Sequence, residues 1–135
     1  MLTIESKTGM ARAGRKEVYR YLSDFNNFKH LLPEEKMKDL QLSADTIRFS
    51  MDGIGAIGLR IAEKTPYSEL VIRATEGSPA DFTLHIHIGE TKDNRSPVNL
   101  ILEANLNLFL EMMAKGPLQQ FVDMIADKIT EIQFP

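Results

Sequence analysis

Three glycines in the segment SMDGIGAIGLRI (residues 50–61) have the Gly-x-Gly-x-x-Gly spacing that holds a pyrophosphate in dinucleotide-binding folds. Such a site also needs a helix that opens within the motif and an acidic residue about twenty positions further on. Alternating apolar and polar residues follow the glycines instead, which is the pattern of a strand. We therefore interpret Gly53 as a turn residue, and Gly55 and Gly58 as sites of a bulge or bend in a curved sheet.

Two glutamates, Glu63 and Glu76, fall in phase with apolar strand residues that we expect to face inward. Paired carboxylates carry general acid and base chemistry, and glycosidases hold them about 5–9.5 Å apart. With a tight turn at TPYS, Glu63 would lie opposite Leu70 and Glu76 opposite Ile57, which separates the two by ~20 Å. This distance excludes paired catalysis. Each glutamate is expected in water at a sheet end, where one could contact a polar group of a ligand.

The segment LHIHI places His85 and His87 on one face of a strand. Even pairing through KDNRSP would bring Glu103 opposite His87, and two histidines with one carboxylate form a zinc ligand set. That face is opposite the strand's apolar residues, so it is the outer surface of the sheet and has no pocket. We predict no metal site here but a cross-strand polar ladder. Its members are Arg73, His85, His87, Glu103 and Asn105.

Composition limits the function of the chain. Its 135 residues are 43% hydrophobic and 26% charged, which predicts a single domain over residues 1–135. A net charge of -3 and a pI near 5.6 argue against binding to nucleic acid. The absence of cysteine is compatible with a reducing cytosol. Without a signal-peptide pattern or a run of about eighteen apolar residues, we predict a cytoplasmic protein with no stable membrane insertion.

The apolar pattern predicts the elements that must position these residues. Alternation from Leu2 predicts a first strand that ends at Gly9, and helical spacing then predicts two short helices between Gly14 and Pro33. Period-two alternation returns from Leu40 and predicts six strands, the last of which continues to residue 108. From Pro117 onward, the spacing predicts an amphipathic helix of about four turns.

This order of elements resembles the helix-grip fold of the START/Bet v 1-like superfamily, also called SRPBCC or polyketide cyclase-like. The resemblance covers nearly the whole chain and rests on ARAGRKEVYRYLSDFNNFKHLLP, GIGAIGLRI and KGPLQQFVDMIADKI. It implies an α+β fold in which a curved antiparallel sheet of about seven strands wraps around the C-terminal helix. It also implies a cavity between them, which family members use for lipids, sterols, polyketides or other apolar ligands. Some members are aromatases or cyclases, and others are co-chaperone or toxin-like modules.

The residues expected to line this cavity are almost wholly apolar. A hydrolase or cyclase needs a proton donor or acceptor near its substrate, and the deep positions offer none. The same pattern fits a filled core, and the two methionines before the last helix suit either a cavity rim or a core gap. The candidate ligand-binding residues are Phe25, Phe28, Phe49, Met51, Leu59, Ile61, Ile72, Phe82, Leu84, Ile86, Leu102, Leu106, Met112, Met113, Phe121 and Ile125, and the polar candidates at the cavity mouth are Arg60, Glu63 and Tyr67.

Three functions stay open on this basis. The leading hypothesis is binding, and in one variant transport, of a small hydrophobic or amphipathic ligand without a cofactor. The second is an aromatase or cyclase that takes protons from the mouth residues, although the lack of a catalytic set leans against an enzyme. The third is a protein-interaction module with a filled core. A cavity of roughly 300 Å³ or more would favour the first two. The oligomeric state is left open.

Overall fold

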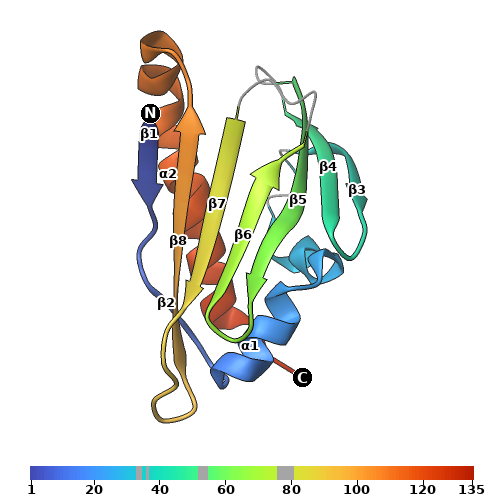
Figure 1. Cartoon of the computed structure of the whole chain (residues 1–135), viewed down its shortest axis with the longest axis vertical. Coiled ribbons are helices and arrows are strands. Elements are labelled where there is room, and N and C mark those ends of the chain that lie inside the picture. The colour runs from blue at the N-terminus through green and yellow to red at the C-terminus, as the bar shows by residue number, and fades with distance from the viewer. Residues whose placement is uncertain (33–34, 36, 52–54, 76–80) are drawn as a thin grey trace.

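A curved antiparallel sheet and a long helix make up most of the molecule (Figure 1). The computed structural model describes residues 1–32, 35, 37–51, 55–75 and 81–135, and of Met51 the backbone only. The α+β class and the predicted order of elements are confirmed. The elements are β1 (Leu2–Glu5), β2 (Gly9–Ala11), α1 (Arg15–Leu22), the 3-10 helix η1 (Phe25–His30), β3 (Lys38–Leu42), β4 (Thr46–Met51), β5 (Gly55–Thr65), β6 (Glu69–Ala74), β7 (Asp81–Ile88), β8 (Ser96–Asn105) and α2 (Leu108–Glu131).

The strands form one sheet in the order β1-β8-β7-β6-β5-β4-β3, and β2 pairs with β8 further along from β1. The predicted first strand is therefore two strands. Ser6 causes the interruption, because its hydroxyl accepts the amide N–H of Leu100 at 2.9 Å in place of a backbone carbonyl. The side chain of Ser6 is buried, as the alternation with Leu2 and Ile4 predicts.

Two of the predicted turns, at TPYS and KDNRSP, lie within the described residues and connect hairpins there. Between β7 and β8, Asp93 and Asn94 have φ values of 54° and 60°, the left-handed conformation that both central residues of a type I′ turn require. Between β5 and β6, Tyr67 also has a positive φ, of 70°. Asn and Asp tolerate this conformation better than other non-glycine residues, so the residues of KDNR themselves favour the turn.

Two short helical segments follow β2, as predicted, and the second is a 3-10 helix. Val18 and Leu22 lie four positions apart on the buried side of α1. Asp24 then caps η1 by accepting the N–H of Asn26 at 3.0 Å. The rings of Phe25 and Phe28 meet edge to face at 4.8 Å, and both are buried. These two segments therefore pack against the sheet and contribute apolar side chains to the core.

The prediction that the last strand continues to residue 108 is wrong, as is the start of the last helix at Pro117. Leu106 and Leu108 alternate with asparagines, which imitates a strand beyond the end of the sheet. The side chain of Asn107 instead accepts the N–H of Leu110 at 2.9 Å and caps α2. The helix has 24 residues, and Pro117 lies in its interior.

The hydrophobic core lies between the concave face of the sheet and the helices. Figure 1 shows α2 running along β8 on one side of the sheet, with α1 and η1 near its lower end. The residues of α2 that join the core are Val122, Ile125, Ala126 and Ile129. They all lie in the second half of the helix, so α2 is a core element only from about its middle onward.

Candidate functional site

Cross-strand pairing arranges the inward apolar residues of the sheet in rows. In the row near the β5–β6 turn, Leu70 pairs with Ile86 and Ile86 with Leu100, and each is 0% exposed. In the next row, Ile72 pairs with Leu84, which is 7% exposed. The lower part of the concave face is therefore a filled core.

The row above is more open to solvent. Here Leu59 pairs with Ala74 and Phe82 with Ala104. Leu59 and Phe82 are only partly buried although their register points them inward. Along β7 the exposure of inward residues thus rises toward the start of the strand, from Ile86 at 0% to the partly exposed Phe82, whereas on β5 Ile57, one row beyond Leu59, is again buried at 8%.

The helix shows the same gradient. Ile125 and Ile129 are buried, whereas Leu118 and Phe121, one to two turns nearer the start of α2, are partly exposed. Both layers therefore become accessible at the same end of the molecule. We call this region the open end and define it by four partly exposed residues. They are Leu59, Phe82, Leu118 and Phe121.

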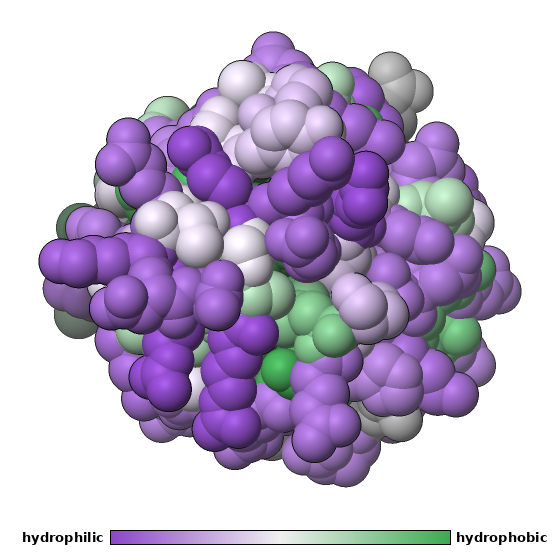
Figure 2. All heavy atoms as spheres, turned by 90° about the horizontal axis from the view of Figure 1, so that it is seen from below, coloured by the Kyte–Doolittle hydropathy of each residue, from purple (hydrophilic) through white to green (hydrophobic). Residues whose placement is uncertain are grey.

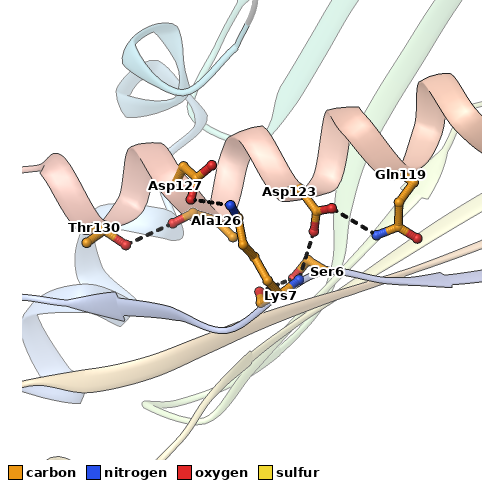
Figure 3. A network of polar contacts seen from close by, with 7 residues as sticks. All are labelled: Ser6, Lys7, Gln119, Asp123, Ala126, Asp127 and Thr130. Atoms are coloured by element: carbon orange, nitrogen blue, oxygen red, sulfur yellow. Dashed lines mark hydrogen bonds and ion pairs between the residues drawn. The ribbon is translucent and has the colours of Figure 1, made fainter.

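Polar contacts hold the second half of α2 against the segment between β1 and β2 (Figure 3). The backbone N–H of Lys7 donates to Asp123 at 2.8 Å, and the amide of Gln119 donates to the carbonyl of Glu5 at 2.9 Å. The Lys7 ammonium lies 2.8 Å from Asp127. The hydrogen bond to Asp127 raises the pKa of Lys7 above its ordinary value. The helix is thus fixed beside the sheet at the level of the filled core.

The predicted ligand-binding residues divide by burial. The side chain of Met51 lies outside the description, and Met112 and Met113 are 76% and 62% exposed on α2, so they neither precede the helix nor fill the core. Only the partly exposed group is accessible to a ligand without rearrangement. The buried residues are Phe25, Phe28, Phe49, Ile72, Leu84, Ile86, Leu102 and Ile125, and the partly exposed ones are Leu59, Ile61, Phe82, Leu106 and Phe121.

Glu63 does not face inward. A bulge between Ile61 and Glu63 shifts the β5–β6 register by one residue, so that Glu63 pairs with Val71 instead of Leu70. Such a shift turns every later side chain of a strand to the other face. Glu63 therefore lies on the outer face, 64% exposed and 3.9 Å from Arg73.

The other two mouth candidates are also away from the open end. Arg60 pairs with Arg73 on the outer face, since its neighbours Leu59 and Ile61 point inward. Tyr67 lies in the β5–β6 turn, where its ring meets that of Tyr19 edge to face at 5.7 Å. The three polar candidates, Arg60, Glu63 and Tyr67, therefore do not converge on one site.

The glycine motif is only partly described. Gly53 and Glu76 lie outside the described residues. The pairing of β4 with β5 continues without a shift through Gly58, so no bulge occurs there, and the bulge of β5 lies further on. A side chain at Gly58 would overlap the hydroxyl of Thr75, and Gly55 begins β5 with a φ of 102°. Both glycines lie in a strand, as expected, but the bulge predicted at this part of the sheet is found further along β5, between Ile61 and Glu63.

The outer face carries the predicted polar ladder with a corrected register. The β7–β8 pairing places Thr83 opposite Glu103 and Asn99 opposite His87. His85 still reaches Glu103 diagonally at 2.7 Å, and His87 lies 3.1 Å from Glu69. Within the described ranges, no three ligand side chains gather closely enough to hold a metal ion.

A shallow hollow of about 210 Å³ lies at the opposite end of the molecule from the open end. It is smaller than the roughly 300 Å³ at which ligand pockets begin. Burial raises the pKa of Tyr21, one of its lining residues. Seen from below, this end is mostly hydrophilic, with a small apolar area recessed among polar side chains (Figure 2). The hollow is lined by Glu17, Arg20, Tyr21, Asn27 and Pro135.

Reasoning from the sequence missed one group of exposed apolar residues. Leu108, Phe109 and Leu110 form the first turn of α2 and are 73%, 69% and 45% exposed. Asn107 carried the signal that could have found them, because asparagine is a preferred helix-capping residue. Of the helices described, none is long and apolar enough to span a bilayer.

Comparison with known proteins supports the fold by structure alone. No family model matches the chain, and no curated protein does. Norcoclaurine synthase from Thalictrum flavum superposes with a TM-score of 0.69 at 14% identity, over 98% of this chain and 95% of that one. A START superfamily protein from Mycobacterium smegmatis gives 0.66 at 11% identity, over 97% and 99%. The fold is that of the START/Bet v 1-like superfamily.

A second structure of norcoclaurine synthase contains dopamine and hydroxybenzaldehyde and gives a TM-score of 0.68 at 15% identity, over 99% of this chain and 89% of that one. The START/Bet v 1-like fold thus extends over nearly the whole chain. At such low identity the likeness concerns the fold, and function has to be argued from this chain's own residues.

Proposed function

We propose that this chain binds a small hydrophobic or amphipathic molecule at the open end, between the sheet and α2. The observation that carries the proposal is the partial exposure of inward-facing apolar residues beside a filled core. Leu70 is 0% exposed, whereas Leu59 and Phe82 point inward by register and remain partly exposed. Apolar side chains that face inward and still meet water gain free energy when a ligand covers them, by roughly 25 cal/mol per Å².

Binding without catalysis is supported by the chemistry of this face. General acid or base catalysis needs a titratable group within hydrogen-bond reach of the substrate. The mouth candidates Arg60 and Glu63 lie on the outer face, so the enzyme hypothesis loses the residues on which it depended. Norcoclaurine synthase, which shares the fold, was solved with two small aromatic compounds, dopamine and hydroxybenzaldehyde. That precedent fits an aromatic or otherwise apolar ligand for this chain.

Native mass spectrometry of the purified protein, followed by solvent extraction, tests the proposal first. We expect either a co-purifying apolar molecule or stoichiometric uptake of an apolar fluorescent probe such as anilinonaphthalene sulfonate. Leu59→Arg should weaken binding of the probe at least tenfold, because the charge enters the open end. Met10→Arg is the matched control, since Met10 is 40% exposed on β2 and should leave binding unchanged.

A protein that contains no molecule and takes up neither the probe nor any member of a lipid and polyketide panel would refute the proposal. The filled-core interaction module would then be the better hypothesis. Equal loss of probe binding in both arginine variants would also count against it, because binding would then not depend on the open end.

A further inference from the structure

The first turns of α2 expose a cluster of apolar side chains at the same end of the molecule as the open end. We call this cluster the apolar tip. Monomeric proteins rarely expose contiguous apolar surface of more than a few hundred Å², and larger patches mark interaction sites. Its members are Leu108 (73% exposed), Phe109 (69%), Leu110 (45%), Met112 (76%) and Met113 (62%).

The apolar tip covers somewhat more than half of the helix circumference, which is wider than one narrow stripe. At about 100° per residue, positions 108, 109, 110, 112 and 113 cover roughly 200° of the helix circumference. A helix that docks in a protein groove or against a second helix presents residues at i, i+3, i+4 and i+7, which leaves its other side polar. Exposed apolar residues over so wide an arc are instead suited to a medium that covers more than one side of the tip, such as lipid.

The carboxylate of Glu111 is the charged group of this segment, and it points away from the exposed apolar side chains. Glu111 is the one ionisable residue between Leu106 and Ala114. Its side chain is 22% exposed, and its carboxylate lies 3.4 Å from the amino group of Met1 on the sheet side of the helix. The opposite end of the molecule is mostly hydrophilic (Figure 2). The exposed apolar cluster of α2 thus lies far from the hydrophilic end of the molecule.

The apolar tip lies before the part of α2 that is hydrogen-bonded to the N-terminal segment, and Glu111 within this stretch of the helix is ion-paired with Met1. Gln119 binds the last residue of β1, Asp123 and Asp127 bind Lys7 just after it, and all three helix residues lie after Pro117 (Figure 3). The backbone of Gly116 has no neighbour within 4 Å of its Cβ position. Six residues of helix, 108–113, span ~9 Å, which matches the ~5–10 Å depth of the headgroup and upper acyl region of a bilayer.

We propose that the apolar tip inserts into the headgroup region of a lipid bilayer and docks the open end of the molecule on the membrane surface. With a net charge of -3 and no basic residue among positions 106–114, the tip is suited to zwitterionic lipid, and binding should be insensitive to salt. This inference concerns a surface contact and does not require that the chain carry a ligand.

The chain contains no tryptophan, so a single one can report on the tip. Phe109→Trp should show a blue shift of its emission on addition of phosphatidylcholine vesicles, and lipids brominated near the carbonyl groups should quench it. Met10→Trp is the matched control on β2 and should show neither effect. Emission from F109W that vesicles leave unchanged would overturn the proposal.

Vesicle co-sedimentation supplies the second readout. The variant L108Q/F109Q/M112Q/M113Q replaces apolar side chains by a good helix former, so its circular dichroism and melting temperature should match the wild type. We expect its partition onto phosphatidylcholine vesicles to fall at least tenfold, whereas Met10→Gln should bind like the wild type. Sedimentation velocity tests the alternative that a second copy of this chain covers the apolar tip. A wild-type dimer that the quadruple variant abolishes, with no vesicle binding by either protein, would assign the tip to a second copy and refute the membrane contact.

Discussion

A methyl group at position 9 would overlap the carbonyl oxygen of Ala126, because β2 passes directly against α2 at this point. Neither backbone can move away easily, since Gly9 pairs with Val98 in β8 and Ala126 is 0% exposed. We expect Gly9→Ala to lower the free energy of unfolding by about 1–3 kcal/mol, the usual cost of overpacking. Urea denaturation followed by circular dichroism measures this change.

Gly116→Ala is the matched control for this substitution. No atom of another element lies within 4 Å of a Cβ at Gly116, which is inside α2 and precedes Pro117. The helix propensity of alanine favours the substitution by about 0.5–1 kcal/mol, and the steric effect of Pro117 on a preceding Cβ opposes it, so we expect the free energy of unfolding to change by less than about 1 kcal/mol. Equal effects of the two substitutions would contradict the close approach of β2 to α2.

Asp123 accepts the backbone N–H of Lys7 and the amide of Gln119, at 2.8 and 3.2 Å. Asp123→Ala leaves that N–H without its acceptor, and a hydrogen bond to a charged group contributes on the order of 1–2 kcal/mol. We expect a loss of this size, measured by thermal and urea unfolding.

The control for Asp123 lies one turn further along the same helix. Asp127 forms an ion pair with Lys7 in which both side chains are more than half exposed, at 59% and 54%. Exposed ion pairs contribute little to stability, so Asp127→Ala should leave the unfolding midpoint close to that of the wild type. A larger effect at Asp127 than at Asp123 would show that the ion pair, and not the backbone hydrogen bond, fixes the helix.

The fold could be predicted from the sequence because alternation and helical spacing are strong where one face is buried. Leu84 and Ile86 alternate with polar residues and lie in the core as expected. The start of α2 could not be found in this way, because Leu106, Leu108 and Leu110 alternate like a strand although Leu108 and Leu110 belong to a helix. One capping side chain, that of Asn107, decides the local structure.

The site was harder to predict, because a single extra residue reverses the face of a strand. No glycine or proline in the sequence indicates the bulge before Glu63, and this bulge moves Glu63 from the inner to the outer face. In the β7–β8 hairpin, the positive φ values of Asp93 and Asn94 fix the turn and shift Glu103 from His87 to Thr83. Partial exposure of Leu59 depends on three-dimensional packing and has no signal in the sequence.

Burial raises the pKa of Tyr21 above its ordinary value of 10.0. The unfolded chain then loses this proton at a lower pH than the folded protein does, so deprotonation favours unfolding. The contribution of Tyr21 to stability is complete below about pH 10 and is lost as the pH rises through the raised value. We expect the melting temperature of Tyr21→Phe to fall less than that of the wild type between about pH 9.5 and 11.5.

The same two proteins at pH 7 provide the reference for this measurement. The hydroxyl of Tyr21 donates only a long hydrogen bond, 3.4 Å, to the carbonyl of Asn27, and phenylalanine keeps the edge-to-face contact with Phe134. The melting temperatures should therefore be similar at neutral pH. Parallel curves for both proteins up to pH 11.5 would show that burial of the phenol does not affect stability.

Leu70 and Leu59 both point toward the concave face but differ in burial, and their truncation separates a filled core from an open one. Leu70 is 0% exposed, so Leu70→Ala leaves a cavity and should cost about 2–5 kcal/mol. Leu59 is partly exposed, and its truncation removes less buried surface, so we expect less than about 2 kcal/mol. Urea denaturation of both variants compares them directly. Equal losses would mean that Leu59 is packed as tightly as the core, which would remove the observation on which ligand binding at the open end is proposed.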